Sequence, residues 1–302
     1  MGEIDDDSRP HRKVLRLPEV QLIGAQKAGT SAVADWLFQD GGYVRPRVFD
    51  DEPWYYSKEV HFFDSESRYE RGVDFYAQRF VQRGAKNEEL KAMDATPDTL
   101  PFAERVRCIY EAAGGNQADK VKIIVILREP VSRELSLYNH LVFDCRNLSP
   151  AERTAWHNQV VKDDGAIMSF DEFVLEKSVP ALARHTGPGR STRHSMYATH
   201  LRQWFQLFDR QQILVLAYDE LQHLPEQSQD RIQRFLGHKI SGRLSRSNSN
   251  DSVDKIRSPS PRAREALLAA FAPYNEDLYR LLESDTGPSM EQRPFPRFKM
   301  LS

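Results

Sequence analysis

Three apolar segments constrain the fold of this 302-residue chain more than any other feature. Their sequences are VQLIGA (20–25), VKIIVILREP (121–130) and QILVLAYDEL (212–221). The apolar part of each runs without alternating polar residues, which is typical of strands buried on both faces of a parallel sheet. Helical patterns lie between and after them, at TSAVADWLFQD (30–40), Val131–Leu141, Met196–Phe208 and AREALLAAFAPYNEDLYRLLES (263–284). This alternation predicts an α/β protein with a central, mostly parallel sheet flanked by helices.

The charge and cysteine content exclude several classes of function. The 42 basic and 44 acidic residues leave a net charge of −2, so we expect no nucleic-acid partner. No apolar run reaches the roughly 20 residues that a membrane-spanning helix needs, so we expect no membrane span. Cys108 and Cys145 are too few for a disulfide framework, which favours a cytoplasmic protein. A Golgi-lumenal enzyme trimmed of its membrane anchor is the alternative, and the oligomeric state is left open.

The chain divides into one folded domain and two terminal segments. We expect a flexible N-terminal arm over residues 1–17, a single domain over 18–285 and a C-terminal tail over 286–302. Within the domain, residues 241–262 form an inserted loop that is rich in serine and arginine and has no apolar period. One interpretation of this loop is a surface connection. The other is a basic flap that closes over an anionic ligand.

The turn after the first strand, GAQKAGTS (24–31), has the composition of a phosphate-binding loop. Its small residues allow backbone N–H groups to converge on an oxyanion, and the following helix N-terminus adds partial positive charge. Thr30 and Ser31 add hydroxyl donors. P-loop NTPases carry a lysine directly before the Ser/Thr, but here Thr30 takes that place and Lys27 is the lysine of the turn. The domain is therefore P-loop-like without matching an ATPase, and a plain strand–helix turn is the alternative.

A second anion-binding element follows the second strand, in LREPVSRELSLYNH (127–140). Arg128 stands where a magnesium-binding aspartate would end the strand of an NTPase, so we expect no metal requirement. Pro130 suits the first turn of a helix, and Ser132 and Ser136 lie four residues apart on one face of it. In a parallel sheet this strand ends at the same edge as the first, so Arg128 and Ser136 are placed to bind a second phosphate. The alternative is a salt-bridged Arg128 with solvent-facing serines.

With both elements in place, the chain resembles the sulfotransferases that use 3′-phosphoadenosine 5′-phosphosulfate (PAPS), especially the branch that contains the heparan sulfate sulfotransferases. In this resemblance IGAQKAGTSAVADWL is the 5′-phosphosulfate loop and LREPVSRELSLY the 3′-phosphate element. SKEVHFFD (57–64), the helix–strand segment 193–221 and PYNEDLYRLL (273–282) also match, in order. The resemblance implies PAPS as the cofactor, held by Gln26, Lys27, Ala28, Gly29, Thr30, Ser31, Arg128 and Ser136.

The resemblance also implies the catalytic groups. Sulfuryl transfer needs a deprotonated acceptor and a cation at the departing bridging oxygen. Lys27 is the cation and Glu59, in KEVHFFD, is the general base. We expect the apolar neighbours Val60, Phe62 and Phe63 to desolvate Glu59 and raise its pKa. A solvated Glu59 that only pairs with Lys58 is the alternative.

His61 is the third predicted catalytic residue. If the segment is extended, His61 lies on the same face as Glu59 and either orients the acceptor or shares the proton transfer. A histidine packed in the core is the alternative. We expect Asp64 to stabilise this loop rather than to react.

The acceptor is the least specified part of the prediction. In MDATPD (93–98) Ala95 replaces the lysine of the heparan enzymes, and the C-terminal disulfide loop of those enzymes is missing. We therefore expect a hydroxyl of a carbohydrate or a small molecule, contacted by Lys58, Asp94 and Tyr197. N-sulfation of an amine is chemically similar and stays open. Tyr197 and Trp204 also suit a core.

Two other classes of function are weighed against the sulfotransferase. A magnesium-dependent P-loop kinase or NTPase is disfavoured by Thr30 and Arg128 at the positions described above. A non-catalytic nucleotide-binding relative has no need of both Lys27 and Glu59, and both are present.

Overall fold

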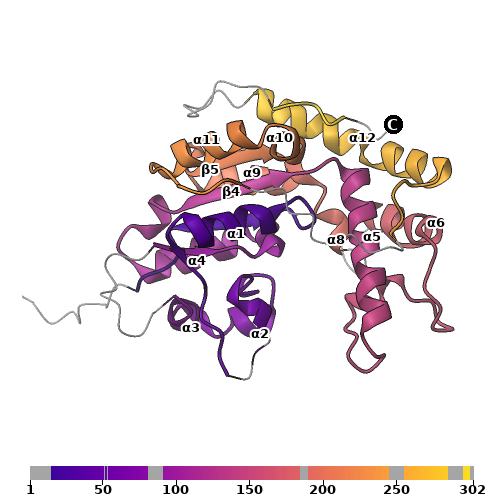
Figure 1. The fold of residues 1–302 in the computed structure, drawn as a ribbon, viewed down its shortest axis with the longest axis horizontal. Helices are drawn as coiled ribbons and strands as arrows, with labels where there is room; N and C mark the ends of the chain where they lie inside the picture. Colours follow the sequence, from indigo (N-terminus) through magenta and orange to yellow (C-terminus); the bar gives the residue numbers. More distant parts are fainter. Residues whose placement is uncertain are drawn as a thin grey trace, which may run out of the picture.

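The computed structural model of the chain describes residues 15–50, 52, 54–80, 91–183, 190–244, 255–284 and 295–299. Residues 1–14 of the predicted arm (1–17), the centre of the Ser/Arg-rich loop (241–262) and most of the tail (286–302) lie outside these residues. The arm is shorter than predicted, because Leu17 is buried and the backbone N–H of Leu15 donates to the carbonyl oxygen of Ala113 at 3.2 Å. In the described part, five parallel strands form one sheet in the order β2-β3-β1-β4-β5 (Figure 1). The strands are β1 (Val20–Gly24), β2 (Tyr43–Val44), β3 (Lys91–Asp94), β4 (Lys122–Leu127) and β5 (Ile213–Ala217). The predicted α/β class with a parallel central sheet is confirmed.

The apolar segments form the centre of the sheet because each must be buried on both faces. All five residues of β1 are buried, and β4 pairs with β1 on one side and with β5 on the other. Ile123 to Leu127 of β4 lie opposite Ile213 to Ala217 of β5, in register along the whole of β5. The two missed strands, β2 and β3, are too short and too polar to stand out as apolar runs.

Helices cover both faces of the sheet and extend beyond its carboxyl edge. The α-helices are α1 (Thr30–Asp40), α2 (Glu66–Tyr69), α3 (Gly72–Gln78), α4 (Ala103–Ala113), α5 (Pro130–Asn147), α6 (Phe170–Phe173), α7 (Val179–Ala183), α8 (Arg190–Arg193), α9 (Tyr197–Leu207), α10 (Tyr218–His223), α11 (Pro225–Leu236) and α12 (Pro261–Glu283). Short 3₁₀ turns are η1 (Trp54–Ser57), η2 (Pro97–Thr99), η3 (Gln117–Asp119), η4 (His157–Val160) and η6 (Arg210–Gln212), and η5 (Val174–Ser178) is π-helical. Within the described ranges, no helix has the length and apolar character that crossing a bilayer requires.

The predicted elements agree with these bounds except at three ends. The strand predicted over 121–130 ends at Leu127, before α5 begins at Pro130. The helix predicted at Val131–Leu141 continues to Asn147. The strand predicted over 212–221 ends at Ala217, and Tyr218 begins α10, so the second half of that prediction is wrong. The acidic residues Asp219 and Glu220 occupy the first turn of α10, where they favour a helix N-terminus.

The connections between strands place a binding edge beside β1 and β4. From β1 the chain crosses through α1 toward β2, and from β3 it crosses back over β1 through α4 to β4. Right-handed crossovers in opposite directions put α1 and α4 on opposite faces. The loops after β1 and β4 therefore diverge at the carboxyl edge, which is where open α/β sheets bind ligands.

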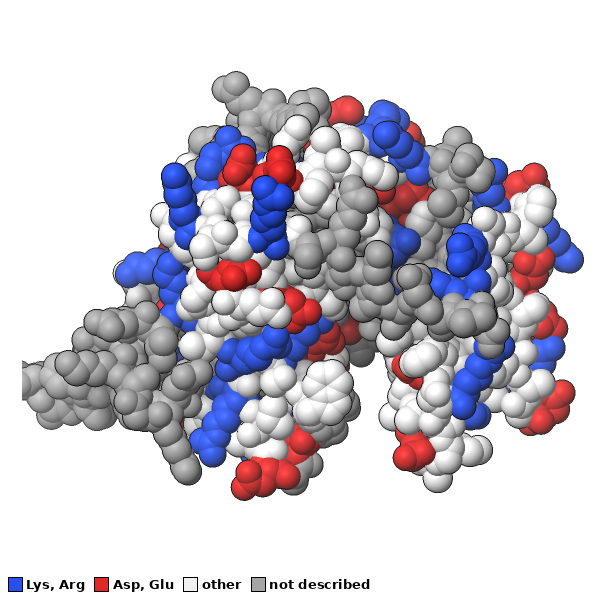
Figure 2. Space-filling view, in the orientation of Figure 1, with Lys and Arg blue, Asp and Glu red and all other residues white. Residues whose placement is uncertain are grey.

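Two clusters of buried apolar side chains form the core of the protein. The larger surrounds the sheet, and the smaller joins α5 to α6 and α12 through side chains such as Leu141, Phe173 and Phe271. In Figure 1, α2 and α3 lie below the sheet on one side, and the lower end of α5 lies on the other. The space-filling view shows a deep notch between these two parts (Figure 2).

Candidate functional site

The turn after β1 forms an open cradle with the geometry to hold an anion. Lys27 has φ 67° and Gly29, the N-cap of α1, has φ 84°, and no side chain caps the first turn of the helix. The first backbone N–H groups of α1 are therefore available to an anion. A Cβ on Gly24 would lie 2.6 Å from the carbonyl oxygen of Pro97, so the start of the turn requires glycine.

Lys27 and Arg128 bring two half-buried cations together in this cradle. Arg128 Nη1 donates to the carbonyl oxygen of Lys27 at 2.9 Å, and its guanidinium lies 4.5 Å from the ring centre of Tyr218. Burial, together with the charge of Arg128, lowers the pKa of Lys27 to about 8. Burial also lowers the pKa of Arg128, and its Nε has no hydrogen-bond partner among the described residues. Cations desolvated in this way are stabilised when an anion binds between them.

The two serines at the start of α5 differ in their hydrogen bonding. Glu129 caps the helix by accepting hydrogen bonds from the backbone N–H groups of Val131 and Ser132. Ser132 Oγ donates to the same carboxylate at 2.7 Å, so this hydroxyl is used in the cap. Ser136, one turn further, is half-buried and makes no side-chain hydrogen bond within the described part of the chain. Its role as a second phosphate contact stays a prediction.

Tyr197 is buried and holds the backbone of Arg128 through a hydrogen bond. Its side chain is 1% exposed, and its hydroxyl donates to the carbonyl oxygen of Arg128 at 2.8 Å. The prediction that Tyr197 contacts the acceptor is therefore wrong in this structure. Trp204 is also fully buried and donates to the carbonyl oxygen of Leu100 at 2.8 Å, as its alternative interpretation expected.

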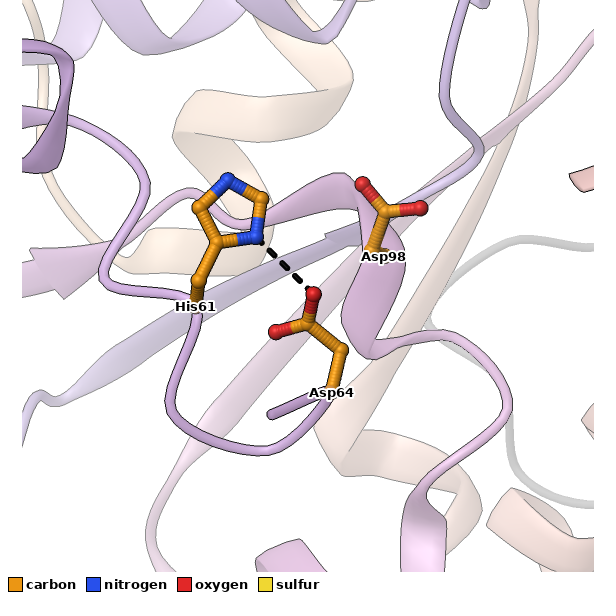
Figure 3. Close-up of side chains that lie close together, drawn as sticks. All are labelled: His61, Asp64 and Asp98. Atoms are coloured by element: carbon orange, nitrogen blue, oxygen red, sulfur yellow. Dashed lines mark hydrogen bonds and ion pairs between the residues drawn. The ribbon is translucent and has the colours of Figure 1, made fainter. Parts of the chain in front are cut away.

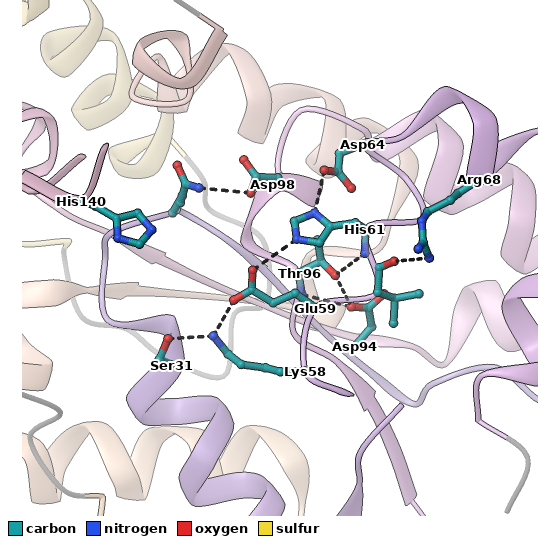
Figure 4. Close-up of polar contacts among 12 residues, drawn as sticks. Ser31, Lys58, Glu59, His61, Asp64, Arg68, Asp94, Thr96, Asp98 and His140 are labelled. Atoms are coloured by element: carbon teal, nitrogen blue, oxygen red, sulfur yellow. Dashed lines mark hydrogen bonds and ion pairs between the residues drawn. The ribbon is translucent and has the colours of Figure 1, made fainter. Parts of the chain in front are cut away.

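Lys58 links the predicted cofactor loop to the predicted base. Its Nζ donates to Ser31 Oγ at 2.7 Å and to Glu59 Oε1 at 2.6 Å (Figure 4). The two side chains of the ion pair are 16% and 25% exposed, so the pair is not the solvated surface pair of the alternative. One lysine therefore sets the distance between the first turn of α1 and the carboxylate of Glu59.

Glu59, His61 and Asp64 form a chain of ionisable groups. His61 Nδ1 lies 2.9 Å from Asp64 Oδ2, and His61 Nε2 lies 3.5 Å from Glu59 Oε2 (Figure 4). His61 has φ 50°, so the segment is not extended there and reaches Glu59 through a turn. With carboxylates at both nitrogens, the pKa of His61 lies well above its usual value although burial opposes this.

The pKa of Glu59 contradicts the expectation from its apolar neighbours. Burial does raise it, but the hydrogen bonds and charges of His61 and Lys58 outweigh burial and lower the pKa of Glu59 to about 2. Val60, Phe62 and Phe63 are fully buried and point into the core. Lys58 and His61 therefore determine the charge state of Glu59.

Asp94 supports the site from inside the core. It is fully buried, and its carboxylate accepts hydrogen bonds from Thr96 Oγ1 at 2.6 Å and from Tyr76 at 2.9 Å. Thr96 in turn accepts the backbone N–H of His61 at 3.2 Å. Burial raises the pKa of Asp94 to about 6, although these hydrogen bonds oppose the rise. The prediction that Asp94 contacts the acceptor is wrong, because its side chain has no surface to offer.

Several supporting residues escaped the sequence analysis because their partners lie far away in the chain. Arg133 is fully buried on α5, and its Nη1 donates to the carbonyl oxygen of Gln26 at 3.3 Å. Arg68 of α2 donates to the carbonyl oxygen of Val60 at 3.2 Å. Arg133 occupies a position of the predicted helix that should be buried. A charged residue at such a position is the sequence signal that could have identified it.

His140 is a further side chain that faces the site. It lies on α5 opposite Glu59 in Figure 4, and its Nε2 is 3.6 Å from Asp144 Oδ2. Burial, together with the charge of Lys27, lowers the pKa of His140 to about 4. A neutral imidazole thus stands beside the predicted catalytic lysine. His140 follows Ser136 by four residues and therefore lies on the same face of α5. This helical spacing was the sequence signal that could have identified His140.

One group of side chains near the base has metal-ligand chemistry. His61, Asp64 and Asp98 each offer one ligand atom, and these atoms lie within 4.8 Å of one another (Figure 3). Both nitrogens of His61 already face carboxylates, and Gln26 Nε2 donates to Asp98 at 3.4 Å. The group is held together as an ion-pair network, and the absence of a metal requirement stays a prediction.

A pocket of about 380 Å³ opens beside Asp64. Its walls come from three places: the residues after the base segment, the start of α4 and the α8–α9 region. The lining includes Asp64, Phe102, Arg105, Arg193, His194 and His200. It combines an aromatic ring with hydrogen-bonding groups of both signs.

Residues 17–266 match the family model of the sulfotransferase domain. The chain belongs to the sulfotransferase family. This match covers more than half of the chain, confirms the predicted family and contradicts the kinase alternative. We expect the folded domain, over 18–285, to extend beyond this match at its C-terminal end.

Curated relatives place this sulfotransferase near the predicted branch. It is 27% identical over 227 residues to human bifunctional heparan sulfate N-deacetylase/N-sulfotransferase 2, covering 74% of this chain and 22% of the relative. It is 24% identical over 228 residues to human heparan sulfate glucosamine 3-O-sulfotransferase 5, covering 76% of this chain and 56% of the relative. The chain thus spans only part of the length of these two proteins. A crystal structure of a sulfotransferase from Alicyclobacillus acidocaldarius shares the fold, with a TM-score of 0.56, 22% identity and coverage of 90% of this chain and 98% of that one.

Proposed function

We propose that this sulfotransferase moves the sulfuryl group of PAPS to a hydroxyl of a carbohydrate or small-molecule acceptor, with Glu59 as the base. The observation that carries the proposal is the pair of desolvated cations, Lys27 and Arg128, beside the uncapped first turn of α1. Such an arrangement suits a ligand with anionic groups at two separated positions, as PAPS has.

The donor is held by the residues that follow β1 and β4. The 5′-phosphosulfate lies on the backbone N–H groups of residues 29–31, with Thr30 and Ser31 as hydroxyl donors and Lys27 at the bridging oxygen. The N–H of Ala28 donates to the carbonyl oxygen of Ala25 at 3.1 Å, so Ala28 shapes the turn. Gln26 shapes the turn through its hydrogen bond to Asp98. The 3′-phosphate contacts Arg128 and Ser136. The positive charge required by these contacts comes from side chains, so no metal ion enters the proposal.

The transfer is an in-line displacement at sulfur. The acceptor oxygen attacks sulfur as its proton passes to Glu59, and the bond from sulfur to the bridging oxygen breaks with Lys27 stabilising the released charge. Binding of the donor at Ser31 draws Lys58 toward the anion and weakens its hydrogen bond to Glu59. The pKa of Glu59 then rises toward a value useful for a base. Asp64 holds His61 against Glu59 during this change.

The acceptor enters through the notch and uses the pocket beside Asp64. Charges of both signs border the notch on the face seen in Figure 2, which favours a neutral or modestly charged acceptor over a polyanion. The pocket volume of about 380 Å³ suits one or two sugar rings or a small aromatic molecule. An amine acceptor is the second candidate, because one matched relative is an N-sulfotransferase. We propose a cytoplasmic protein, with the Golgi lumen as the alternative.

Calorimetric titration with adenosine 3′,5′-bisphosphate, the product of the donor, tests the proposal. We expect tight binding that does not depend on magnesium, and weaker binding of ADP and ATP, which lack the 3′-phosphate. An acceptor screen with radiolabelled sulfate in PAPS then follows. Magnesium-dependent preference for ATP would overturn the donor assignment, and bisphosphate binding without transfer to any acceptor would favour a non-catalytic relative.

A further inference from the structure

Asp98 contacts the turn after β1 with one carboxylate oxygen and the wall of the pocket with the other. Its Oδ2 accepts a hydrogen bond from Gln26 Nε2 at 3.4 Å, and its Oδ1 lies 3.5 Å from His194 Nδ1. Gln26 directly precedes Lys27 in the turn, and His194 lines the pocket of about 380 Å³. One side chain, 17% exposed, therefore joins the place proposed for the donor to the place proposed for the acceptor.

The element that carries Asp98 is packed against the turn and continues into the pocket. Asp98 is the middle residue of η2 (Pro97–Thr99). The carbonyl oxygen of Pro97 would lie 2.6 Å from a Cβ on Gly24, so η2 is in close contact with the backbone where the turn begins. Phe102, the N-cap of α4, follows η2 closely and lines the pocket. One side of the pocket is thus connected to the turn through the backbone of η2, and the other through the Asp98 carboxylate.

The segment that carries His194 is held from the core by Arg133. The guanidinium of Arg133 is fully buried and donates to the hydroxyl of Ser195 and to the carbonyl oxygen of Ser191. Its Nη1 donates to the carbonyl oxygen of Gln26 at 3.3 Å. Arg133 therefore fixes the segments of Gln26 and His194 relative to each other, while Asp98 joins their two side chains. Because the backbone is held on both sides, a change in the Gln26 side chain acts on the ring of His194 through Asp98.

The side-chain amide of Gln26 is held on one side only. Its Nε2 bonds to Asp98, whereas its Oε1 is buried and has no hydrogen-bond partner among the described residues. An anion bound at Lys27 and the first turn of α1 changes the electric field at this adjacent amide. In a site of low dielectric, such a change alters the hydrogen bond that the amide makes to the carboxylate.

We propose that Asp98 is a positioning residue that couples the donor turn to the acceptor pocket, so that a bound donor sets the orientation of the His194 ring. This inference rests on the proposed function. Asp98 itself touches neither substrate. It transmits the state of Gln26 to a ring in the pocket wall, and the acceptor meets the oriented imidazole only when the donor is in place. The coupling is reciprocal, so a bound acceptor changes the affinity for the donor by the same factor.

Histidine side-chain NMR with adenosine 3′,5′-bisphosphate as the probe tests this coupling without an acceptor. The nine histidines are labelled at Cε1, and the His194 signal is assigned with His194→Gln. We expect saturating bisphosphate to shift the His194 signal of the wild type. The signal of His223, which is exposed at the end of α10, should stay in place. An unchanged His194 signal would overturn the inference.

Asp98→Ala removes both contacts of the carboxylate. Asp119→Ala is the matched control, because Asp119 also belongs to a 3₁₀ turn, is exposed and pairs with Arg107 outside the site. We expect the shift of His194 to be lost in Asp98→Ala and kept in the control. Bisphosphate affinity in calorimetry should fall by no more than about fivefold, which is the net effect of a single hydrogen bond. Asp98→Asn keeps polar groups toward both neighbours and should restore most of the shift.

A shift of wild-type size in a folded Asp98→Ala protein would overturn the inference, because the ring would then respond without the carboxylate. If that variant does not fold, Gln26→Leu decides, since it removes the amide that bonds to Asp98. The shift should be lost there too, and its persistence at saturating bisphosphate would overturn the inference. A wild-type protein that does not bind the bisphosphate in calorimetry would refute the proposed function and the inference together. Binding with an unchanged His194 signal would refute the inference alone.

Discussion

Lys58 and Ser31 join the segment that carries the base to the first turn of α1, through a hydrogen bond of 2.7 Å from Nζ to Oγ. The same ammonium group also bonds to Glu59. A change at the anion cradle therefore reaches the carboxylate of Glu59 through a single side chain. Under the proposed function, this link would couple donor binding to the charge state of Glu59.

Lys58→Met should weaken that coupling. Without Lys58, Glu59 loses one hydrogen bond and one nearby cation that hold its pKa at about 2. We expect kcat to fall about tenfold and the acidic limb of the kcat/KM profile to move to higher pH, because the active carboxylate form exists only above its pKa. Lys120→Met, at an exposed position, is the control. An unmoved acidic limb would contradict this role for Lys58.

Glu59→Gln should separate chemistry from binding. The variant keeps the size of the side chain and loses the proton acceptor, so kcat should fall by about 10²–10⁴ while affinity for adenosine 3′,5′-bisphosphate stays near wild type. Asp64→Asn, which only weakens the hold on His61, should give a smaller loss. Full activity in Glu59→Gln would exclude this residue as the base.

Lys27 should make donor affinity depend on pH. Its pKa of about 8 in the free protein means that the ammonium form is lost as the pH rises through about 8. Since the anionic donor favours the charged form, affinity should be highest below this value and decline above it. Titrations of the bisphosphate between about pH 6.5 and 9.5 measure this decline. In Lys27→Ala turnover should be abolished, binding moderately weakened and the decline absent; a decline that persists would assign it to another group.

Arg128 should recognise the 3′-phosphate. Arg128→Ala is expected to bind adenosine 3′,5′-bisphosphate about ten- to a hundredfold more weakly, and to bind AMP, which lacks the 3′-phosphate, nearly as well as the wild type. Arg128→Lys should restore little, because a lysine lacks the planar fork. Equal losses for the two nucleotides would place the contact elsewhere.

Asp94 should affect stability rather than binding. Its pKa is raised from 3.8 to about 6, so between these values the native state binds more protons than the unfolded state. This group therefore lowers stability as the pH rises from about 4 to 6, by an amount on the order of 3 kcal/mol. Asp94→Asn should flatten this part of the pH dependence of Tm and leave bisphosphate affinity near wild type. A large loss of affinity in a stable variant would return Asp94 to the binding site.

The sequence by itself determined the elements that the local chain can form. The apolar runs of β1 and β4, the small residues of the turn at 24–31 and Pro130 at the start of α5 act within a few residues of themselves. Their periodicity and backbone preferences are local properties, so the sheet, the strand–helix turns proposed to bind anions and the family were predictable.

Only the tertiary structure decided what each polar side chain does. Asp94 and Tyr197 are residue types that are common in functional sites, but packing buries both side chains. Each instead forms a hydrogen bond that supports a neighbour, Asp94 to Thr96 and Tyr197 to Arg128. The low pKa of Glu59 depends on the turn at His61, and the hydrogen bond from Arg133 to Gln26 joins residues that are 107 apart in the sequence. Burial, charge state and long-range hydrogen bonds are set by which segments meet in space, and this information is not carried by any local pattern.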